Sequence, residues 1–291
     1  MMLIEIFEQV LNGLLAGAYY LLIALGLTLI FSLGGLVNLA HGAFYALGAY
    51  FAVKLADTFG FGGVLVLSPL AVAVIGLIVE RFLFRRFYRE DPALGLLLTF
   101  GLAMVAEQAL RLIFGASPIP FSIPPALRGQ IFVGDFIYSK YRLLMLAVAI
   151  GAVAGLWLLL RRTPFGRVVR AGVQNPDMVA ALGISLAPYM ASVVALAVGL
   201  AALAGVLLAP ISGVHPAMGA DILTASFVVV VIGGLGSFWG VVAAAVIVGV
   251  VRGLTVYFLP SAAEASMYLL MLLVLLFRPR GLFGERIQRF E

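Results

Sequence analysis

The chain has 291 residues, of which 64% are hydrophobic and 11% are charged, and its mean hydropathy is +1.18. A soluble domain carries roughly 45–50% apolar and about 25% charged residues, so this composition excludes a soluble globular protein. The net charge of +5 does not indicate a nucleic-acid partner, because the arginines cluster in short loops, as membrane orientation produces. The apolar tracts are continuous rather than alternating, which excludes a transmembrane β-barrel and predicts an all-α, polytopic helix bundle in the lipid bilayer.

Nine apolar runs, bounded by charges, prolines or glycine clusters, predict membrane crossings. A hydrocarbon core of about 30 Å takes roughly 20 apolar residues as helix. Several runs are shorter than this, so eight to ten spans, some re-entrant or broken, fit the pattern. The predicted spans are residues 9–33, 36–55, 62–84, 93–113, 142–160, 188–211, 221–235, 238–258 and 263–277.

Arginines between these spans predict the orientation of the chain. The three clusters are Arg81, Arg85, Arg86 and Arg89; Arg161, Arg162, Arg167 and Arg170; and Arg278, Arg280, Arg286 and Arg289. By the positive-inside rule all three lie in the cytoplasm. Nine crossings place them there, with the N-terminus outside and the C-terminus cytoplasmic, provided that the chain breaks at residues 34–35 and 233–237. Glycine tolerates such tight turns because it lacks a Cβ.

Two loops divide what we predict to be one transmembrane domain, residues 1–291. The first, residues 114–141, lies outside by the same parity. Its prolines oppose helix, and "IFVGDFIY" predicts a hairpin around Gly134 and Asp135. Loops of this length are uncommon without a role. We therefore expect it to dock an external protein, with a simple connector as the alternative.

The second loop, residues 161–188, is predicted to be cytoplasmic and to contain a short helix. Asn175 suits the N-cap, Pro176 the first helical position and Asp177 the positive end of the helix dipole, and Gly183 can end the helix. Residues 176–182 are too few to be stable alone. The apolar face of this helix consists of Met178, Val179 and Leu182. It either rests on the membrane surface or inserts into a cleft of a cytoplasmic partner, and the residues alone favour neither.

Polar residues interrupt the apolar tract near residue 40. Asn38 and His41 are three residues apart, with Gly42 adjacent and Tyr45 one turn further. Unpaired polar groups are costly in lipid, so these side chains face protein or water. They either form a hydrogen bond between closely packed helices or begin a discontinuous helix that lines a translocation pathway.

A second break with the same character is predicted near residue 235. It is made up of Gly233, Gly234, Gly236 and Ser237. The segments "LGGL" (33–36) and "IGGL" (232–235) are similar, and each precedes an apolar helix rich in small residues. This similarity hints at an internal repeat but is short.

Charged residues inside the predicted spans are few. Glu107 and Arg111 have i,i+4 spacing with the acid first, which favours an ion pair on one helix face. We interpret them as a structural pair near the outer end of their span rather than as a proton relay. An ion-coupled transporter needs more intramembrane charges than this chain provides.

The sequence lacks the motifs of an enzyme. No G-x-x-x-x-G-K-[ST] segment occurs, so the chain has no P-loop of its own. The two histidines have no zinc-type spacing, and the chain has no cysteine, so we expect no metal site. Hydrolase motifs such as G-x-S-x-G are absent. We therefore expect no catalytic residue and no cofactor on this chain.

Four segments together identify a family that the chain resembles. "GLVNLAHGAFYALGAY", "FGRVVRAGVQNPDMVAALGI", "VVIGGLGSFWG" and "LLFRPRGLFGE" are similar to the permease subunit of bacterial branched-chain amino-acid (Liv-type) ABC importers. The resemblance runs through nearly the whole chain in the same order.

The resemblance implies a transmembrane pore in the bacterial cytoplasmic (inner) membrane. Its implied partners are a second permease chain, homologous or identical, two cytoplasmic ABC ATPases that hold ATP and Mg²⁺, and an extracytoplasmic binding protein that delivers the substrate. The residues implied to couple the permease to the ATPase are Arg167, Arg170, Asn175, Pro176, Asp177, Met178, Leu182 and Gly183. The two polar breaks, at residues 38–45 and 233–237, are implied to lie near the pathway.

Other functions remain open at this stage. The same machine could carry urea, short amides or a sugar, because selection rests largely with the binding protein. A secondary transporter would work alone on an ion gradient. A membrane scaffold without transport would leave the paired glycine breaks unexplained.

Overall fold

The computed structural model describes residues 2–88, 90–133 and 136–284. Within them the chain is mostly helical, as predicted. The helices are α1 (Met2–Gly34), α2 (His41–Phe82), α3 (Pro92–Phe114), α4 (Lys140–Arg162), α5 (Pro164–Gln174), α6 (Pro176–Ala181), α7 (Ala187–Ser212), α8 (Met218–Gly233), α9 (Phe238–Phe258) and α10 (Ala263–Phe277). Short 3₁₀ turns lie at Phe84–Arg86, Pro125–Leu127 and Pro260–Ala262.

Seven of the described helices are long and apolar enough to cross a membrane, and α8 is a shorter apolar helix. The helix α2 is not continuous, because Gly60 has φ of +65° and ψ of 175°. Its two arms, residues 41–59 and 61–82, correspond to two of the predicted spans. Each of the nine predicted apolar segments therefore contains a helix or a helical arm, and the chain is a multi-pass membrane protein.

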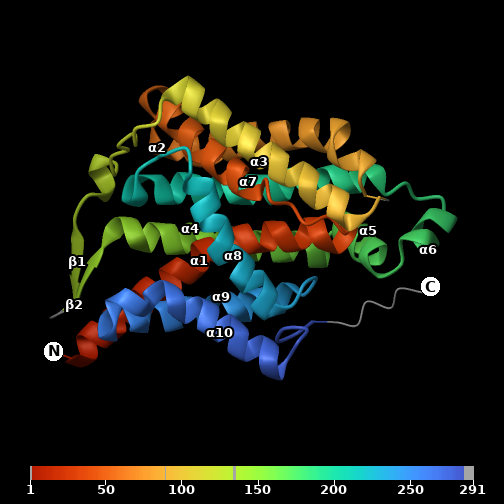
Figure 1. Ribbon diagram of the computed structural model, residues 1–291. Helices are drawn as coiled ribbons and strands as arrows, with labels where there is room; N and C mark the ends of the chain where they lie inside the picture. The colour runs from red at the N-terminus through yellow and green to blue at the C-terminus, as the bar shows by residue number, and fades with distance from the viewer. Residues whose placement is uncertain (1, 89, 134–135, 285–291) are drawn as a thin grey trace.

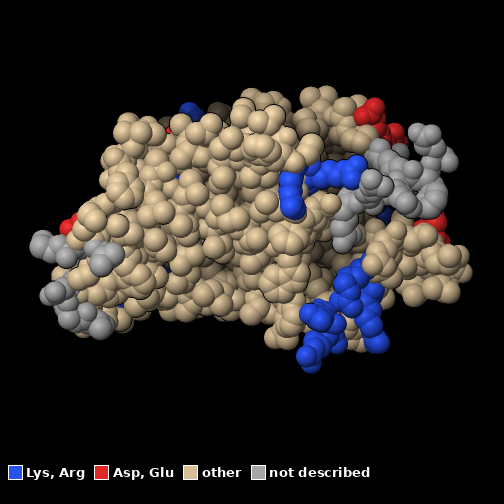
Figure 2. Space-filling model, turned by 90° about the horizontal axis from the view of Figure 1, so that it is seen from below, with Lys and Arg blue, Asp and Glu red and all other residues tan. Residues whose placement is uncertain are grey.

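The long helices lie side by side, and their two ends carry different features (Figure 1). The start of α1 and the hairpin lie at one end, and α5 and α6 lie at the other. Lysine and arginine side chains gather toward the α5–α6 end in the view of Figure 2, where the body of the molecule is mostly free of charge. We call these the hairpin end and the basic end.

The centre of the bundle is formed by α1, α2 and α7. The helix α7 packs chiefly against α2, and α1 packs against α9 and α7. Small side chains such as Ala197, Ala201 and Ala202 are fully buried at these contacts. Small residues allow close approach of helices, which is how helices associate in lipid.

The predicted hairpin is present. Its strands, β1 (Gln130–Val133) and β2 (Phe136–Ser139), pair antiparallel with Gln130 opposite Ser139. The predicted turn at Gly134 and Asp135 lies outside the described residues. The hairpin is fixed to α1, because Asn12 Oδ1 accepts hydrogen bonds from Tyr138 Oη at 3.2 Å and from Arg142 Nη1 at 2.6 Å.

One predicted boundary was wrong, and one helix was missed. The span 36–55 was expected to be helical from its start, but residues 35–40 are not helical and α2 begins at His41. In the loop 161–188 one helix was predicted, and the structure has two. The missed helix, α5, begins at Pro164 behind an N-cap, since Thr163 Oγ1 accepts a hydrogen bond from Gly166 N at 3.1 Å.

Candidate functional site

The segment 35–40 connects α1 to α2 as non-helical chain that ends in a turn. The helix α1 ends at Gly34, and Gly35 has φ of +65°. Backbone groups without helical partners need others inside a membrane. Thr99 of α3, fully buried, supplies them: its Oγ1 accepts from Leu39 N and donates to Val37 O, both at 3.1 Å. The break in the helix is therefore supported by a neighbouring helix.

The helix α2 begins well inside the bundle, where it meets the first turn of α8. A Cβ on Gly42 would collide with the carbonyl group of Gly219, and a Cβ on Gly219 would collide with that of Gly42. His41, next to Gly42, packs against Gly26 of α1. Gly26 is eight residues before the end of α1, which is about 12 Å along a helix. The N-termini of two helices thus meet at depth.

A pocket of about 250 Å³ lies at this junction. Three elements line it: the start of α2, the start of α8 and one face of α3. The lining includes Leu39, Gly42 and Ala43, then Pro216, Gly219, Ala220 and Thr224, and on α3 Phe100, Met104, Glu107 and Leu110. We call it the α2–α3–α8 pocket. Its wall is mostly apolar, with one carboxylate.

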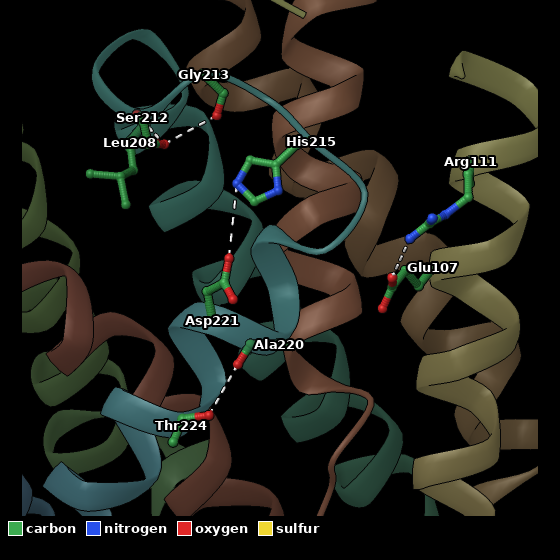
Figure 3. Close-up of polar contacts among 9 residues, drawn as sticks. All are labelled: Glu107, Arg111, Leu208, Ser212, Gly213, His215, Ala220, Asp221 and Thr224. Atoms are coloured by element: carbon green, nitrogen blue, oxygen red, sulfur yellow. Dashed lines mark hydrogen bonds and ion pairs between the residues drawn. The ribbon is translucent and has the colours of Figure 1, made fainter. Parts of the chain in front are cut away.

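Charged side chains lie on α3 and near the start of α8 (Figure 3). On α3, Arg111 Nη2 lies 3.0 Å from Glu107 Oε1, and both side chains are partly exposed. Before α8, His215 Nε2 lies 3.9 Å from Asp221 Oδ2, a separation that permits an ion pair when His215 is protonated. Acidic side chains therefore lie on α3 and on α8, and of the two Glu107 lines the pocket while Asp221 does not.

The polar residues near residue 40 lie outside this pocket. Asn38, His41 and Tyr45 are buried, and none of them lines the α2–α3–α8 pocket. A Cβ on Gly26 would lie 2.6 Å from His41 Nε2 and 2.7 Å from the carbonyl oxygen of Ala197, so the ring packs among α1, α2 and α7. Neither its ring nitrogens nor the amide atoms of Asn38 have hydrogen-bond partners within the described chain. Asn38 precedes α2, so the two do not share a helix face.

The second break, residues 233–237, lies apart from this pocket. The helix α8 ends at Gly233, and Ser237 caps α9 by accepting a hydrogen bond from Gly240 N at 3.1 Å. The chain after α10 covers the end of α8, since Leu282 N donates to Ile232 O at 2.8 Å, and Gly234 lies against the same segment. Gly236 lines a different pocket, between α1, α4, α5 and α9. Of the eight residues expected near the pathway, Gly42 alone is among the described residues that line the α2–α3–α8 pocket.

The short helix α6 has the caps that its sequence predicts. Asn175 Oδ1 accepts a hydrogen bond from Met178 N at 2.9 Å, and Gly183, with φ of +77°, donates to Ala180 O at 2.9 Å. Pro176 and Asp177 occupy its first turn. The side chains of Met178 and Leu182 are 58% and 72% exposed. An apolar, preformed face therefore projects from the basic end.

The arginines near α6 differ in their contacts. Arg170 Nη1 donates to the carbonyl of Leu160, which joins α5 to the end of α4. Arg167 is exposed on α5. Residues that sequence reasoning missed, Thr99 and Gly219, have partners far away in the chain, so no local pattern indicates them.

These features are those of a membrane transport subunit. The chain forms a multi-pass bundle whose helices are broken at depth, with a small pocket at the break and an exposed short helix at the basic end. A model of the family described as "Branched-chain amino acid transport system / permease component" matches residues 9–277. The chain belongs to this family.

Three relatives show how far the similarity extends. The high-affinity branched-chain amino acid transport system permease protein BraD of Pseudomonas aeruginosa is 29% identical over 96% of this chain and 95% of its own length. The LivH permease protein of Escherichia coli K12 is 27% identical, with the same coverage. The LivM permease protein of the same organism is 28% identical over 90% of this chain and 67% of its own length.

Proposed function

We propose that this chain is one permease subunit of an ATP-binding-cassette importer and forms the pathway for branched-chain amino acids handed over by an extracytoplasmic binding protein. The observation that carries the proposal is the family match over residues 9–277. The names of the relatives supply the substrate class, and the α2–α3–α8 pocket has chemistry that suits it.

A branched-chain amino acid presents a carboxylate, an ammonium group and an apolar side chain. Helix N-termini favour negative charge through unpaired N–H groups and the helix dipole, and the first turns of α2 and α8 both line the pocket. Discontinuous helices hold anionic substrate groups in this way in other transporters. Glu107 is the carboxylate of the pocket lining, and since its Oε1 is paired with Arg111, we assign its Oε2 to the ammonium group; Phe100 and Met104 offer apolar contact.

The fuel for transport is proposed to come from partner chains. Two ATPases would hold ATP and Mg²⁺, and α6 would dock into one of them through Met178 and Leu182. A docked partner would cover these exposed apolar side chains, which a lone membrane-surface helix would leave among lipid head groups. This proposal requires the basic end to face the cytoplasm and the hairpin end to face outward, in agreement with the positive-inside rule.

A second permease chain is proposed to complete the pore. In E. coli K12 two different permease chains, LivH and LivM, are both similar to this protein. A pairing of related, non-identical chains is therefore the arrangement we favour. Copurification of a differently tagged second copy of this chain would indicate a homodimer instead.

Reconstitution in proteoliposomes tests the proposal. The chain is combined with the related permease, the ATPases and the binding protein encoded beside its gene, and radiolabelled leucine, isoleucine and valine are supplied outside with ATP inside. We expect ATP-dependent uptake that requires every component and that is stronger than uptake of urea or a sugar. Uptake of urea or sugar in preference to the amino acids would overturn the substrate assignment.

A control separates this machine from an ion-coupled carrier. The chain alone, in proteoliposomes with a proton or sodium gradient and no ATPase, is expected to accumulate nothing. Accumulation by the chain alone would show a secondary transporter and refute the proposed subunit role.

A further inference from the structure

An apolar groove follows one face of α4, between α1 and α9. It has a volume of about 450 Å³. The side chains of α4 that line it recur at three- and four-residue spacing: Leu146, Ala149, Ile150, Val153, Ala154 and Trp157. Such residues share one helix face. Every described side chain that lines this groove is apolar or aromatic, so its natural occupant is a hydrocarbon chain or another apolar helix.

Toward the basic end the groove continues into a second pocket of about 440 Å³. The two share Trp157, Phe238 and Trp239. The second pocket adds two cations, Arg161 of α4 and Arg170 of α5. No carboxylate occurs among the described residues that line either pocket. The two pockets together form a cleft that is apolar along α4 and is lined by two arginines at the basic end.

Aromatic rings stand where the lining changes from apolar to charged. The Trp157 and Trp239 ring centroids lie 6.3 Å apart, and the Arg161 guanidinium lies 5.2 Å from the Trp157 ring centroid. Trp is enriched at the level of lipid head groups, because its ring is apolar and its N–H is polar. The change of lining therefore has the character of a membrane–water boundary.

The length of the groove agrees with one lipid leaflet. From Leu146 to Trp157 the helix α4 advances by eleven residues, about 16 Å at 1.5 Å per residue. Half of a hydrocarbon core of about 30 Å is about 15 Å. Arg161 follows Trp157 by one helical turn, at the depth of the head groups.

We propose that this groove is a binding site for an anionic phospholipid of the leaflet at the basic end, with an acyl chain along α4 and the phosphate between Arg161 and Arg170. Basic pockets between membrane helices bind anionic lipid head groups by charge attraction. The head group would bridge α4 and α5, the helix that precedes α6. This inference goes beyond the transport proposal and does not depend on the cargo.

A second copy of this chain fits the groove less well. Two permeases in one membrane have the same orientation, and a two-fold interface presents the same patch on both chains. Such an interface would bring both copies of Arg161 and Arg170 to the same depth in one patch whose described lining has no carboxylate, and like charges repel. An anionic lipid neutralises the two arginines instead.

Native mass spectrometry tests the proposal on the full chain, released from nanodiscs that contain phosphatidylglycerol and phosphatidylcholine with identical acyl chains. We expect retained phosphatidylglycerol in the wild-type chain and not in the double variant Arg161→Ala/Arg170→Ala, since each arginine near an anionic lipid surface contributes about fivefold in affinity. Arg162→Ala is the matched control, because Arg162 neighbours Arg161 and does not line the pocket. Equal retention by the double variant and the wild type would overturn the proposal.

A second pair of variants tests the apolar half. Ala154→Phe fills the groove from an exposed position of α4, and Ala147→Phe makes the same change at an exposed position that does not line it. We expect only the first to lower lipid retention. If Ala154→Phe has no effect while inorganic phosphate still binds at the arginines, the site takes free phosphate and the proposal is wrong. A photoreactive residue at position 154 should label lipid, and labelling of a second permease chain would also overturn it.

Discussion

The hydroxyl of Thr99 forms hydrogen bonds with two backbone groups of the non-helical segment 35–40. Thr99→Val keeps the shape of the side chain, removes the acceptor of Leu39 N, and removes the hydroxyl proton that Val37 O shares with Leu96 O of α3. Such a loss costs about 1–3 kcal/mol for each buried group. We expect a lower melting temperature of the purified chain in detergent and weaker uptake by the assembled transporter.

The matched control for this prediction is Thr255→Val. The Oγ1 of Thr255 donates only within its own helix, to Val251 O at 2.7 Å. The loss of that bond leaves the helical backbone paired, so the change in melting temperature should be smaller. An equal change in the two variants would contradict the role assigned to Thr99.

The contact between Gly42 and Gly219 leaves no room for a side chain on either residue. Gly42→Ala places a methyl group against backbone that cannot move aside without shifting a helix, and overpacking of this kind costs about 1–3 kcal/mol. Melting in detergent and leucine uptake measure the effect, and we expect both to fall. Gly151→Ala, on α4 with no neighbour within 4 Å of the added Cβ, is expected to be neutral or stabilising by up to about 1 kcal/mol.

The short helix α6 shows what local sequence can specify. Its predicted range, residues 176–182, differs by one residue from the observed Pro176–Ala181. The prediction succeeds because Asn175 and Gly183 flank the helix directly, and their contacts are with residues of the helix itself. The helix α5 has an equivalent start at Thr163 and Pro164, and the same reasoning would have found it.

The segment 35–40 shows what local sequence cannot specify. Its glycines predict a break at residues 34–35, and the structure has one. How far the break extends depends on Thr99, which is 60 residues from Leu39 in the chain. The α2–α3–α8 pocket likewise depends on Gly219, far from Gly42, so a pattern within either segment could not predict it. The nine apolar segments were predictable because each follows from composition over a whole helix.

The exposed face of α6 makes a prediction about assembly. Leu182→Asp changes a side chain that is 72% exposed, so the permease itself should fold and melt as before. If α6 inserts into an ATPase cleft, a charge at this position should weaken docking about tenfold, as truncation of a central interface residue does. Copurification of the ATPase measures docking, and stimulated uptake should fall in parallel.

Phe132→Asp is the control for this docking prediction. Phe132 is 68% exposed on the hairpin, at the opposite end of the molecule (Figure 1). Its substitution should leave ATPase copurification unchanged. If Leu182→Asp also leaves copurification and stimulated uptake unchanged, α6 is not the docking element.

The whole molecule has one basic end and one end with the hairpin, and its orientation decides which partners can reach which surface. The absence of cysteine from the sequence makes this directly measurable, because an introduced cysteine is the sole thiol. Ala126→Cys, in the 3₁₀ turn before the hairpin, and Ala181→Cys, at the end of α6, are both at exposed positions. We expect a membrane-impermeant maleimide added to intact cells, or to spheroplasts where an outer membrane is present, to label the first and not the second.

Permeabilised membranes should make both positions reactive, which excludes burial as the reason for weak labelling. The reverse pattern would place α6 outside, out of reach of a cytoplasmic ATPase, and would refute the coupling role together with the proposed energy source. Labelling of both positions in intact cells would indicate mixed insertion. The arginines oppose that outcome, because their clusters favour one side of the membrane. Orientation is thus the property on which the roles proposed for the hairpin, the pocket and α6 depend together, since in the proposed importer the substrate enters from the side opposite to the ATPases.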